Sequence, residues 1–209
     1  MSELPDGIVR QQFGDDRRLA TRGPRVGAEP TADGWRSWAP TRSKLAAMLE
    51  LGMDIGLRDG QAVLYLGAAA GTTVSHVADV AGPTYAVEFA TRPMRDLLEV
   101  AADRPNLFPL LKDARRPTSY GHIVEPVDLL VQDVATRGQA DVAVRNARYL
   151  RPGGRLALVV KSRSEDVTAP PDRVYERAFE QLEEVYTVHD HARLDRFHED
   201  HLAVIGERR

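Results

Sequence analysis

Short apolar runs alternate with amphipathic stretches from residue 63 onward, a pattern typical of strands and helices that follow one another. The first run, Val63 to Leu66, is apolar at every position, as in a strand buried on both faces. It ends in the small residues Gly67 to Gly71, and Thr72 and Thr73 stand where a helix can begin. A strand, a tight turn and a helix N-terminus in this order can cradle a nucleotide-like ligand.

The same alternation predicts an α/β domain with an open, mostly parallel sheet. Further strands are expected at residues 84–89, 106–111, 127–133, 156–160, 185–192 and 201–206. Helices are expected from Pro40 and Thr41 to about Gly52, and at residues 72–80, 92–102, 139–150 and 172–182, with a turn at 151–154.

The first 34 residues differ from the rest in being rich in Gly, Pro, Asp and Arg. Short alternating pieces at residues 7–13 and 18–22 predict a small β extension there, with a partly disordered arm as the alternative. We therefore divide the chain into an extension, residues 1–34, and a main domain, residues 35–209.

Charged side chains stand at the ends of successive predicted strands: Glu88, Asp113, Asp133 and Lys161. Because the carboxyl ends of parallel strands converge on one crevice, these four groups should line a single pocket. Glu88 follows Gly67 by 21 residues, close to the spacing at which an acid binds ribose hydroxyls in dinucleotide-binding folds.

Composition limits the class of protein. At 209 residues and 43% hydrophobic content, one main globular domain is expected. No apolar run approaches the roughly 18 residues that span a bilayer, and no signal peptide is recognised. The absence of cysteine excludes disulfides and thiolate metal sites and fits a cytoplasmic protein. The net charge of −3 argues against a protein that coats nucleic acid generally.

Lysine is rare in this chain. Of the 28 basic residues, 25 are arginines and the lysines are Lys44, Lys112 and Lys161. Arginine serves most surface roles of lysine, so the lysines that remain are candidates for roles that need a titratable amine.

Two phosphate-binding patterns can be tested against the glycine turn. Both G-x-x-x-x-G-K-[ST] and G-x-G-x-x-G are absent, and the turn holds no basic residue to meet a pyrophosphate. Acids on neighbouring strands suit a ligand with ribose hydroxyls, an amino group and a positive centre, as in S-adenosylmethionine. Glu88 then fits the ribose, Asp113 with Ala114 the adenine edge, and Thr72 with Thr73 the polar tail.

Several motifs resemble the fibrillarin family, and more narrowly its archaeal 2′-O-methyltransferases of rRNA and tRNA. They are Val63 to His76, Tyr85 to Phe89, Asp133 to Ala135, Val160 to Ser164, and Asp200 with His201. The resemblance runs from the Trp-Ala-Pro-Thr-Arg-Ser-Lys segment to the end of the chain. This chain departs from the family pattern at Thr136, where Gln is common, with Gln139 nearby, and at Arg196-Phe197, where Pro-Tyr is common.

The resemblance implies a Rossmann-like, seven-stranded class I S-adenosylmethionine-dependent methyltransferase sheet with a small N-terminal β appendage. It implies a catalytic tetrad at Lys44, Asp133, Lys161 and His201. The cofactor positions that it implies are Gly67, Ala68, Thr72, Thr73, Glu88, Phe89, Asp113, Ala114, Asp133, Val134, Ala135 and Thr136.

The resemblance also implies 2′-O-methylation of ribose in pre-rRNA and tRNA by the catalytic subunit of a box C/D ribonucleoprotein. Its partners would be the guide RNA, the target rRNA or tRNA, a Nop-domain scaffold protein and a kink-turn-binding ribosomal-type protein, with no membrane. The net acidic charge and the lack of an RNA-binding module fit an enzyme that does not select its target alone. The alternatives are a stand-alone methyltransferase of RNA or protein side chains, and a non-catalytic scaffold of the same fold.

Other clusters were weighed against these roles. His189, His191, His198 and His201 lie among acids, but their spacing matches no standard metal ligand set, and no metal is predicted. His76 and the two tryptophans, Trp35 and Trp38, are expected mainly in packing. A basic rim that meets RNA backbone is predicted from Arg92, Arg95, Arg115, Arg116 and Arg163, with ordinary solvated surface as the alternative.

Overall fold

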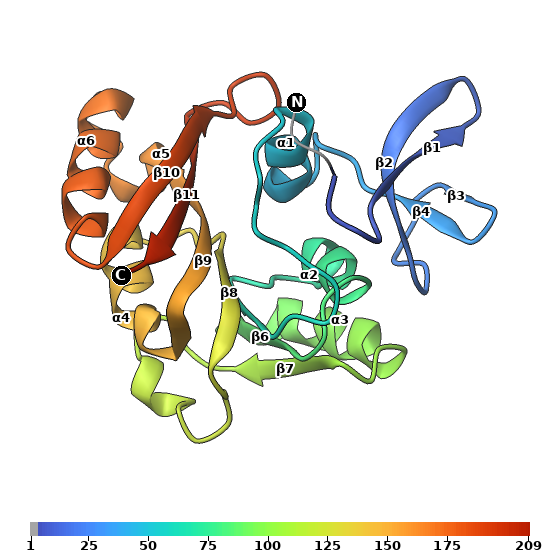
Figure 1. Ribbon diagram of the computed structural model, residues 1–209, viewed down its shortest axis with the longest axis horizontal. Helices are drawn as coiled ribbons and strands as arrows, with labels where there is room; N and C mark the ends of the chain where they lie inside the picture. Colours follow the sequence, from blue (N-terminus) through green and yellow to red (C-terminus); the bar gives the residue numbers. More distant parts are fainter. Residues whose placement is uncertain (1–3) are drawn as a thin grey trace.

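The computed structural model describes residues 4–209 and places a seven-stranded sheet at the centre of the molecule (Figure 1). Its strand order is β10-β11-β9-β8-β5-β6-β7. The bounds are β5 (Val63–Leu66), β6 (Thr84–Glu88), β7 (Leu107–Leu111), β8 (Val127–Gln132), β9 (Leu150–Lys161), β10 (Tyr186–Arg193) and β11 (His201–Arg208).

The strands from β5 to β9 are parallel, and β11 runs antiparallel to β9 and β10. Strand β5 lies between β6 and β8, so the chain leaves β5 in one direction and later returns to its other side. The crevice beyond the carboxyl ends of β5 and β8 is therefore a topological switch point, where open α/β sheets bind ligands. The predicted seven-stranded α/β sheet is confirmed.

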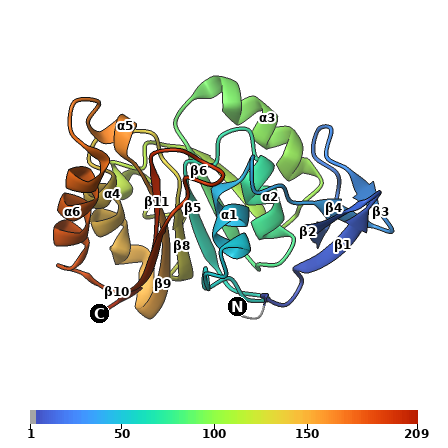
Figure 2. The same ribbon diagram turned by 90° about the horizontal axis from the view of Figure 1, so that it is seen from above.

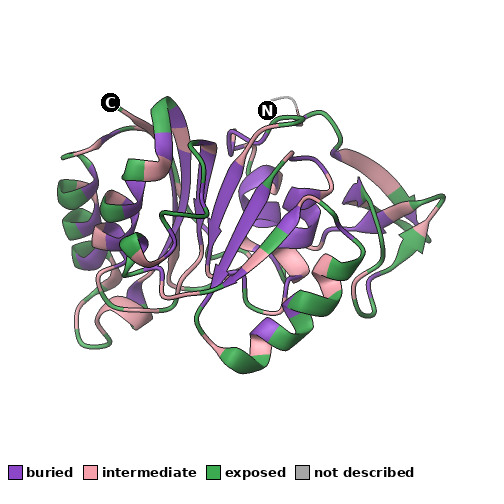
Figure 3. Cartoon of the chain, turned by 90° about the horizontal axis from the view of Figure 1, so that it is seen from below, coloured by how far each residue is buried: buried purple, intermediate pink, exposed green. Residues whose placement is uncertain are grey.

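Helices cover both faces of this sheet (Figure 2). Alternate residues of β5 explain why: Val63 and Tyr65 pack with α1 to α3, whereas Leu64 and Leu66 pack with α4 and α6. The buried strands form the centre of the molecule in Figure 3. The helices are α1 (Lys44–Glu50), α2 (Thr72–Ala78), α3 (Thr91–Ala102), α4 (Gln139–Asn146), α5 (Ser162–Glu165) and α6 (Pro171–Leu182), with 3-10 turns at Pro117–Ser119 and Ala147–Tyr149.

A second, four-stranded antiparallel sheet forms the N-terminal part, in the order β1-β2-β4-β3. The strands are β1 (Val9–Phe13), β2 (Asp16–Arg22), β3 (Thr31–Ala32) and β4 (Trp35–Ser37). This sheet takes in β4, which lies beyond the boundary drawn at residue 34, because Trp35–Ser37 pairs with both β2 and β3. Residues 1–3 of the predicted extension lie outside the described residues.

Buried polar groups join this small sheet to α2. His76 of α2 stacks on Trp38, with ring centroids 4.8 Å apart, and its Nδ1 lies 2.7 Å from Thr21 Oγ1. Burial lowers the pKa of His76 to about 4, so its ring is neutral near pH 7. Trp38 is 1% exposed and donates its indole N–H to Ser43 Oγ at 2.9 Å. The packing roles expected for His76 and Trp38 are confirmed.

The structure corrects two local predictions. The first helix begins at Lys44 rather than at Pro40, because Ser43 caps it by accepting the Ala46 N–H at 3.3 Å. The turn expected at residues 151–154 is part of β9, where the register with β8 shifts between Val127 and Leu129. Among residues 4–209, no helix combines the length and apolarity needed to cross a bilayer.

Candidate functional site

The four charged strand ends meet in one cavity of about 410 Å³, as the alternation of elements predicted. Glu88 ends β6, Asp113 follows β7, Asp133 follows β8 and Lys161 ends β9. Of the residues implied as cofactor contacts, those lining this cavity are Gly67, Glu88, Phe89, Asp113, Ala114, Asp133, Val134, Ala135 and Thr136.

The remaining three implied contacts lie outside the cavity lining. Ala68 is buried, with its N–H 3.1 Å from the carbonyl of Val87. Thr73 forms a side-chain hydrogen bond with Tyr65. Thr72 borders a separate hollow of about 150 Å³ beside Trp38 and His76. The two threonines begin α2 but do not face the same space as Glu88 and Asp113.

The turn after β5 places its backbone against the end of β8. Gly67 has φ +85°, and a Cβ at this position would stand 2.8 Å from the carbonyl oxygen of Asp133. Ala69 also has a positive φ, +47°, which is unusual for a residue other than glycine. This strained turn directs the Ala69 N–H toward Glu88.

Gly67→Ala should weaken the binding of S-adenosylmethionine at least about tenfold in calorimetry. Alanine at this φ costs about 1–3 kcal/mol, and its Cβ must also push the backbone at Asp133 away. Gly60→Ala is the matched control, because Gly60 has φ +71° with nothing within 4 Å of an added Cβ. An unchanged affinity in Gly67→Ala would contradict a role for this close approach.

Glu88 is held rigidly at the cavity wall. Its Oε2 accepts the N–H of Ala69 at 2.9 Å and its Oε1 accepts the N–H of Ala90 at 2.7 Å. The residue is only 7% exposed, and each carboxylate oxygen keeps a second lone pair. A carboxylate anchored in this way can accept hydrogen bonds from two hydroxyl groups at once, which suits a ribose diol.

Asp113 and Phe89 border the same cavity as Glu88. The side chain of Arg115 donates to both carboxylate oxygens of Asp113 at 2.8–3.1 Å, and this hydrogen bonding lowers the pKa of Asp113. Asp113 is therefore ionised near neutral pH and can accept from an amino group. Phe89 is 72% exposed, so its ring offers an apolar face to a flat ligand.

Two lysines share the carboxylate of Asp133. Lys161 Nζ lies 2.7 Å from Oδ1, and Lys44 Nζ lies 3.2 Å from Oδ2. Lys161 Nζ also donates to the main-chain carbonyl of Asp133 at 2.9 Å. Helix α1 supplies Lys44, whereas Asp133 and Lys161 follow adjacent parallel strands. Three members of the implied tetrad are thus in direct contact.

The fourth member, His201, lies beside this group without bonding to it. Its Cα pairs with that of Lys161 across β11 and β9. Its Nδ1 lies 2.6 Å from the carbonyl oxygen of Glu199, a contact that leaves Nε2 available. The ring of His198 is 5.9 Å away, and burial lowers the pKa of His198.

Comparison with known proteins identifies the family of this chain. A model of the family described as Fibrillarin matches residues 14–209. The chain belongs to the fibrillarin family. The fibrillarin-like rRNA/tRNA 2′-O-methyltransferase of Halorubrum lacusprofundi is 64% identical to this chain over an alignment of 209 positions. The alignment covers 99% of this chain and 99% of the relative.

Solved fibrillarin structures share the fold. A fibrillarin in complex with Nop5p has a TM-score of 0.91 at 38% identity, over 99% of this chain and 100% of that one. Aeropyrum pernix fibrillarin with natively bound S-adenosyl-L-methionine has a TM-score of 0.84 at 44% identity, over 95% of this chain and 92% of that one. The class I methyltransferase fold with an N-terminal β appendage is therefore confirmed.

Gln139 is a residue that our sequence analysis considered only as a neighbour of Thr136. Thr136 lines the cavity, whereas the fully buried side chain of Gln139 turns toward the end of β9. Its Oε1 accepts the N–H of Lys161 at 2.9 Å and its Nε2 donates to the carbonyl of Lys161 at 3.0 Å. Because β8 ends at Gln132, Gln139 takes the place of β8 beside the main chain of Lys161, whose other neighbour is β11.

The histidines considered as metal ligands have other contacts. His189 Nε2 lies 3.3 Å from Glu207, His191 packs edge-on against Phe179, and His198 Nε2 lies 2.8 Å from the carbonyl of Pro40. Within residues 4–209, no three side chains of His, Asp or Glu gather as a candidate metal site.

Proposed function

We propose that this chain transfers the methyl group of S-adenosylmethionine to ribose 2′-hydroxyls of rRNA and tRNA. The observation that carries the proposal is the contact of Lys44 and Lys161 with Asp133, at the rim of a cavity that also holds Glu88 and Asp113. The similarity to the Halorubrum methyltransferase over the whole chain supports the same reaction class.

The cavity offers suitable groups to the nucleoside part of the donor molecule. The anchored carboxylate of Glu88 suits the ribose hydroxyls, Asp113 suits the adenine amino group, and the exposed ring of Phe89 suits the flat base. When bound, the donor supplies a methyl group on a positively charged sulfur, which an oxygen nucleophile can attack.

The lysine pair acts on the acceptor. A ribose 2′-hydroxyl is a poor nucleophile and must be aligned with the methyl group, and such positioning can supply about 7 kcal/mol or more of the barrier. In our proposal, Lys161 takes or steers the hydroxyl proton. Asp133 orients the Lys161 amine through its carboxylate and its carbonyl oxygen, and Lys44 is the second cation on that carboxylate.

His201 is assigned to the ribose or the adjoining phosphate. Its register opposite Lys161 supports a role on the acceptor side, and its Nδ1 contact with the Glu199 carbonyl fixes the ring. A non-catalytic scaffold would need none of these four side chains, so their arrangement favours an enzyme over that alternative.

We further propose that the chain works within a box C/D ribonucleoprotein, with guide RNA, a Nop-domain scaffold and a kink-turn-binding protein. The fibrillarin at 38% identity is in complex with Nop5p, which supports the scaffold partner. The net charge of −3 agrees with target selection by other components.

The isolated protein should therefore methylate RNA poorly, and activity should appear when scaffold and guide RNA are added. Mapping of 2′-O-methylation in rRNA and tRNA, with and without these components, measures the effect. Strong site-specific methylation by the protein alone would instead favour the stand-alone methyltransferase.

A further inference from the structure

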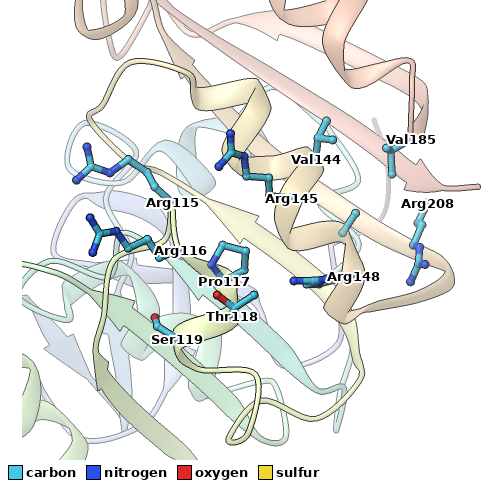
Figure 4. Close-up of a pocket in the computed structure, with 11 residues that line it drawn as sticks. Arg115, Arg116, Pro117, Thr118, Ser119, Val144, Arg145, Arg148, Val185 and Arg208 are labelled. Carbon is cyan, nitrogen blue, oxygen red and sulfur yellow. The ribbon is translucent and has the colours of Figure 1, made fainter.

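An arginine-lined groove of about 760 Å³ lies on the face of the sheet that α4 covers (Figure 4). We call it the arginine groove and define it by Arg115, Arg116, Arg145, Arg148 and Arg208. The first two belong to the segment after β7, the next two to α4 and the following 3-10 turn, and the last to β11. Elements far apart in the sequence thus contribute five arginine residues to the lining of one hollow.

The charge of the groove is not balanced within it. No Asp or Glu lines the groove in the described part of the chain. Arg115 is paired with Asp113 and Arg145 with Asp141, both from outside the lining, and Arg208 donates to the carbonyl of Leu150. Within residues 4–209, the exposed side chains of Arg116 and Arg148 form no ion pair or hydrogen bond. In a chain of net charge −3, this is a local concentration of positive charge.

The groove adjoins the cofactor cavity. Arg115 lines both the groove and the cofactor cavity. In the chain it lies between Asp113, which lines the cavity, and Arg116, which lines the groove. A polyanion lying in the groove could therefore contact Arg115 at the edge of the cofactor cavity, beside Asp113.

We infer that the arginine groove binds the sugar–phosphate backbone of RNA, a proposal that rests on the proposed function. Guanidinium groups form charge-assisted, bidentate hydrogen bonds with phosphate. A protein partner is the less favoured occupant, because five of the eleven lining residues are arginines and none is an acid, and charge of one sign suits a polyanion better than a protein surface of mixed charge.

This site differs from the basic rim expected from the sequence. Arg115 and Arg116 belong to the groove, but Arg163 is paired with Asp200 at 2.7 Å, and Arg92 and Arg95 belong to α3, outside the groove lining. The partners that complete the groove, Arg145, Arg148 and Arg208, come from elements that no spacing in the sequence links to residues 115 and 116.

The test is a double variant, Arg116→Ala with Arg148→Ala, which spares the Arg115 contact with Asp113. Affinity for a mixed-sequence RNA, single-stranded and as a duplex, is measured across a salt series. Affinity falls as salt rises, and each lost phosphate contact should make the slope of log affinity against log salt less steep by about 0.7 to 0.9. The slope of the double variant should therefore be less steep than that of the parent protein by about 1.4 to 1.8. The matched control, Arg17→Ala with Arg25→Ala, removes two exposed arginines from the N-terminal part and should keep the parent slope.

Each outcome decides the inference. A slope equal to that of the parent protein would overturn it, and a loss confined to binding of the Nop-domain scaffold would assign the groove to a protein instead. Calorimetry with S-adenosylmethionine checks that the double variant is folded. A reduced slope in a protein that never methylates RNA would uphold the groove while the proposed function fails, so the two failures are distinguishable.

Discussion

Lys161→Ala should lower the rate of methyl transfer by about 10²- to 10⁴-fold, the usual contribution of a positioned acid or base. The amine of Lys161 is the group held by both the carboxylate and the carbonyl oxygen of Asp133. Alanine removes it and leaves Glu88 and Asp113 in place. Binding of S-adenosylmethionine, measured by calorimetry, should stay within a few-fold of that of the parent protein, while methylation is measured in the assembled complex.

Lys161→Arg is the informative companion. Arginine keeps the positive charge and can pair with Asp133, but it cannot be deprotonated in a protein. If Lys161 takes the hydroxyl proton, this variant should be nearly as slow as Lys161→Ala. If the side chain only steers the proton, the arginine variant should keep much more activity. Full activity in Lys161→Ala would remove Lys161 from the proposed mechanism.

The central features of this site were predictable because they depend on strand order. Apolar runs locate the parallel strands, and the residue after each run must then lie at the same sheet edge. Strand order alone therefore predicts that Glu88, Asp113, Asp133 and Lys161 lie together. The assignment of Lys44 and His201 needed the family resemblance, since neither follows a parallel strand.

Other parts depend on contacts that no local pattern encodes. Ala69 is the second of three consecutive alanines, and nothing in the sequence distinguishes it from its neighbours. Its positive φ and the hydrogen bond from its N–H to Glu88 are seen only in the structure. Gln139 resembles any polar residue at a helix start until its contacts with the Lys161 main chain are seen. Strand β4 was missed because Trp35–Ser37 is three residues long, too short for an alternating pattern. Its central residue, Arg36, is the centre of a buried charge network.

That network connects the N-terminal sheet to α2 and to the segment that follows α3. Arg36 is fully buried, with Nε 3.3 Å from Glu29 Oε2 and 3.5 Å from Asp79 Oδ2. It also donates to the carbonyl of Pro24 at 2.7 Å and to Ser75 Oγ at 2.5 Å. Asp79 receives Arg104 Nε at 3.2 Å as well. Burial raises the pKa of Asp79 although two arginines oppose the change.

Arg36→Met should lower the free energy of unfolding by about 3–5 kcal/mol, the usual cost of removing one partner from a buried ion pair. Methionine fills a similar volume, so most of the loss comes from leaving Glu29 and Asp79 buried without their shared cation. Urea unfolding at neutral pH, monitored by circular dichroism, measures the change in the free energy of unfolding. Arg10→Met is the matched control: Arg10 pairs with Glu50 at 2.9 Å but is 31% exposed, and its loss should cost at most about 1 kcal/mol.

A second substitution separates charge from packing. Adding Glu29→Gln to Arg36→Met removes one of the two carboxylates that lose Arg36 and should restore part of the lost stability, because the remaining cost is largely that of uncompensated charge. If lost packing around the substituted side chain were the cause, the double variant would be no more stable than Arg36→Met alone. Equal losses for Arg36→Met and Arg10→Met would show that the network contributes no more than a surface pair, and the N-terminal sheet would then be held to α2 by apolar contacts instead.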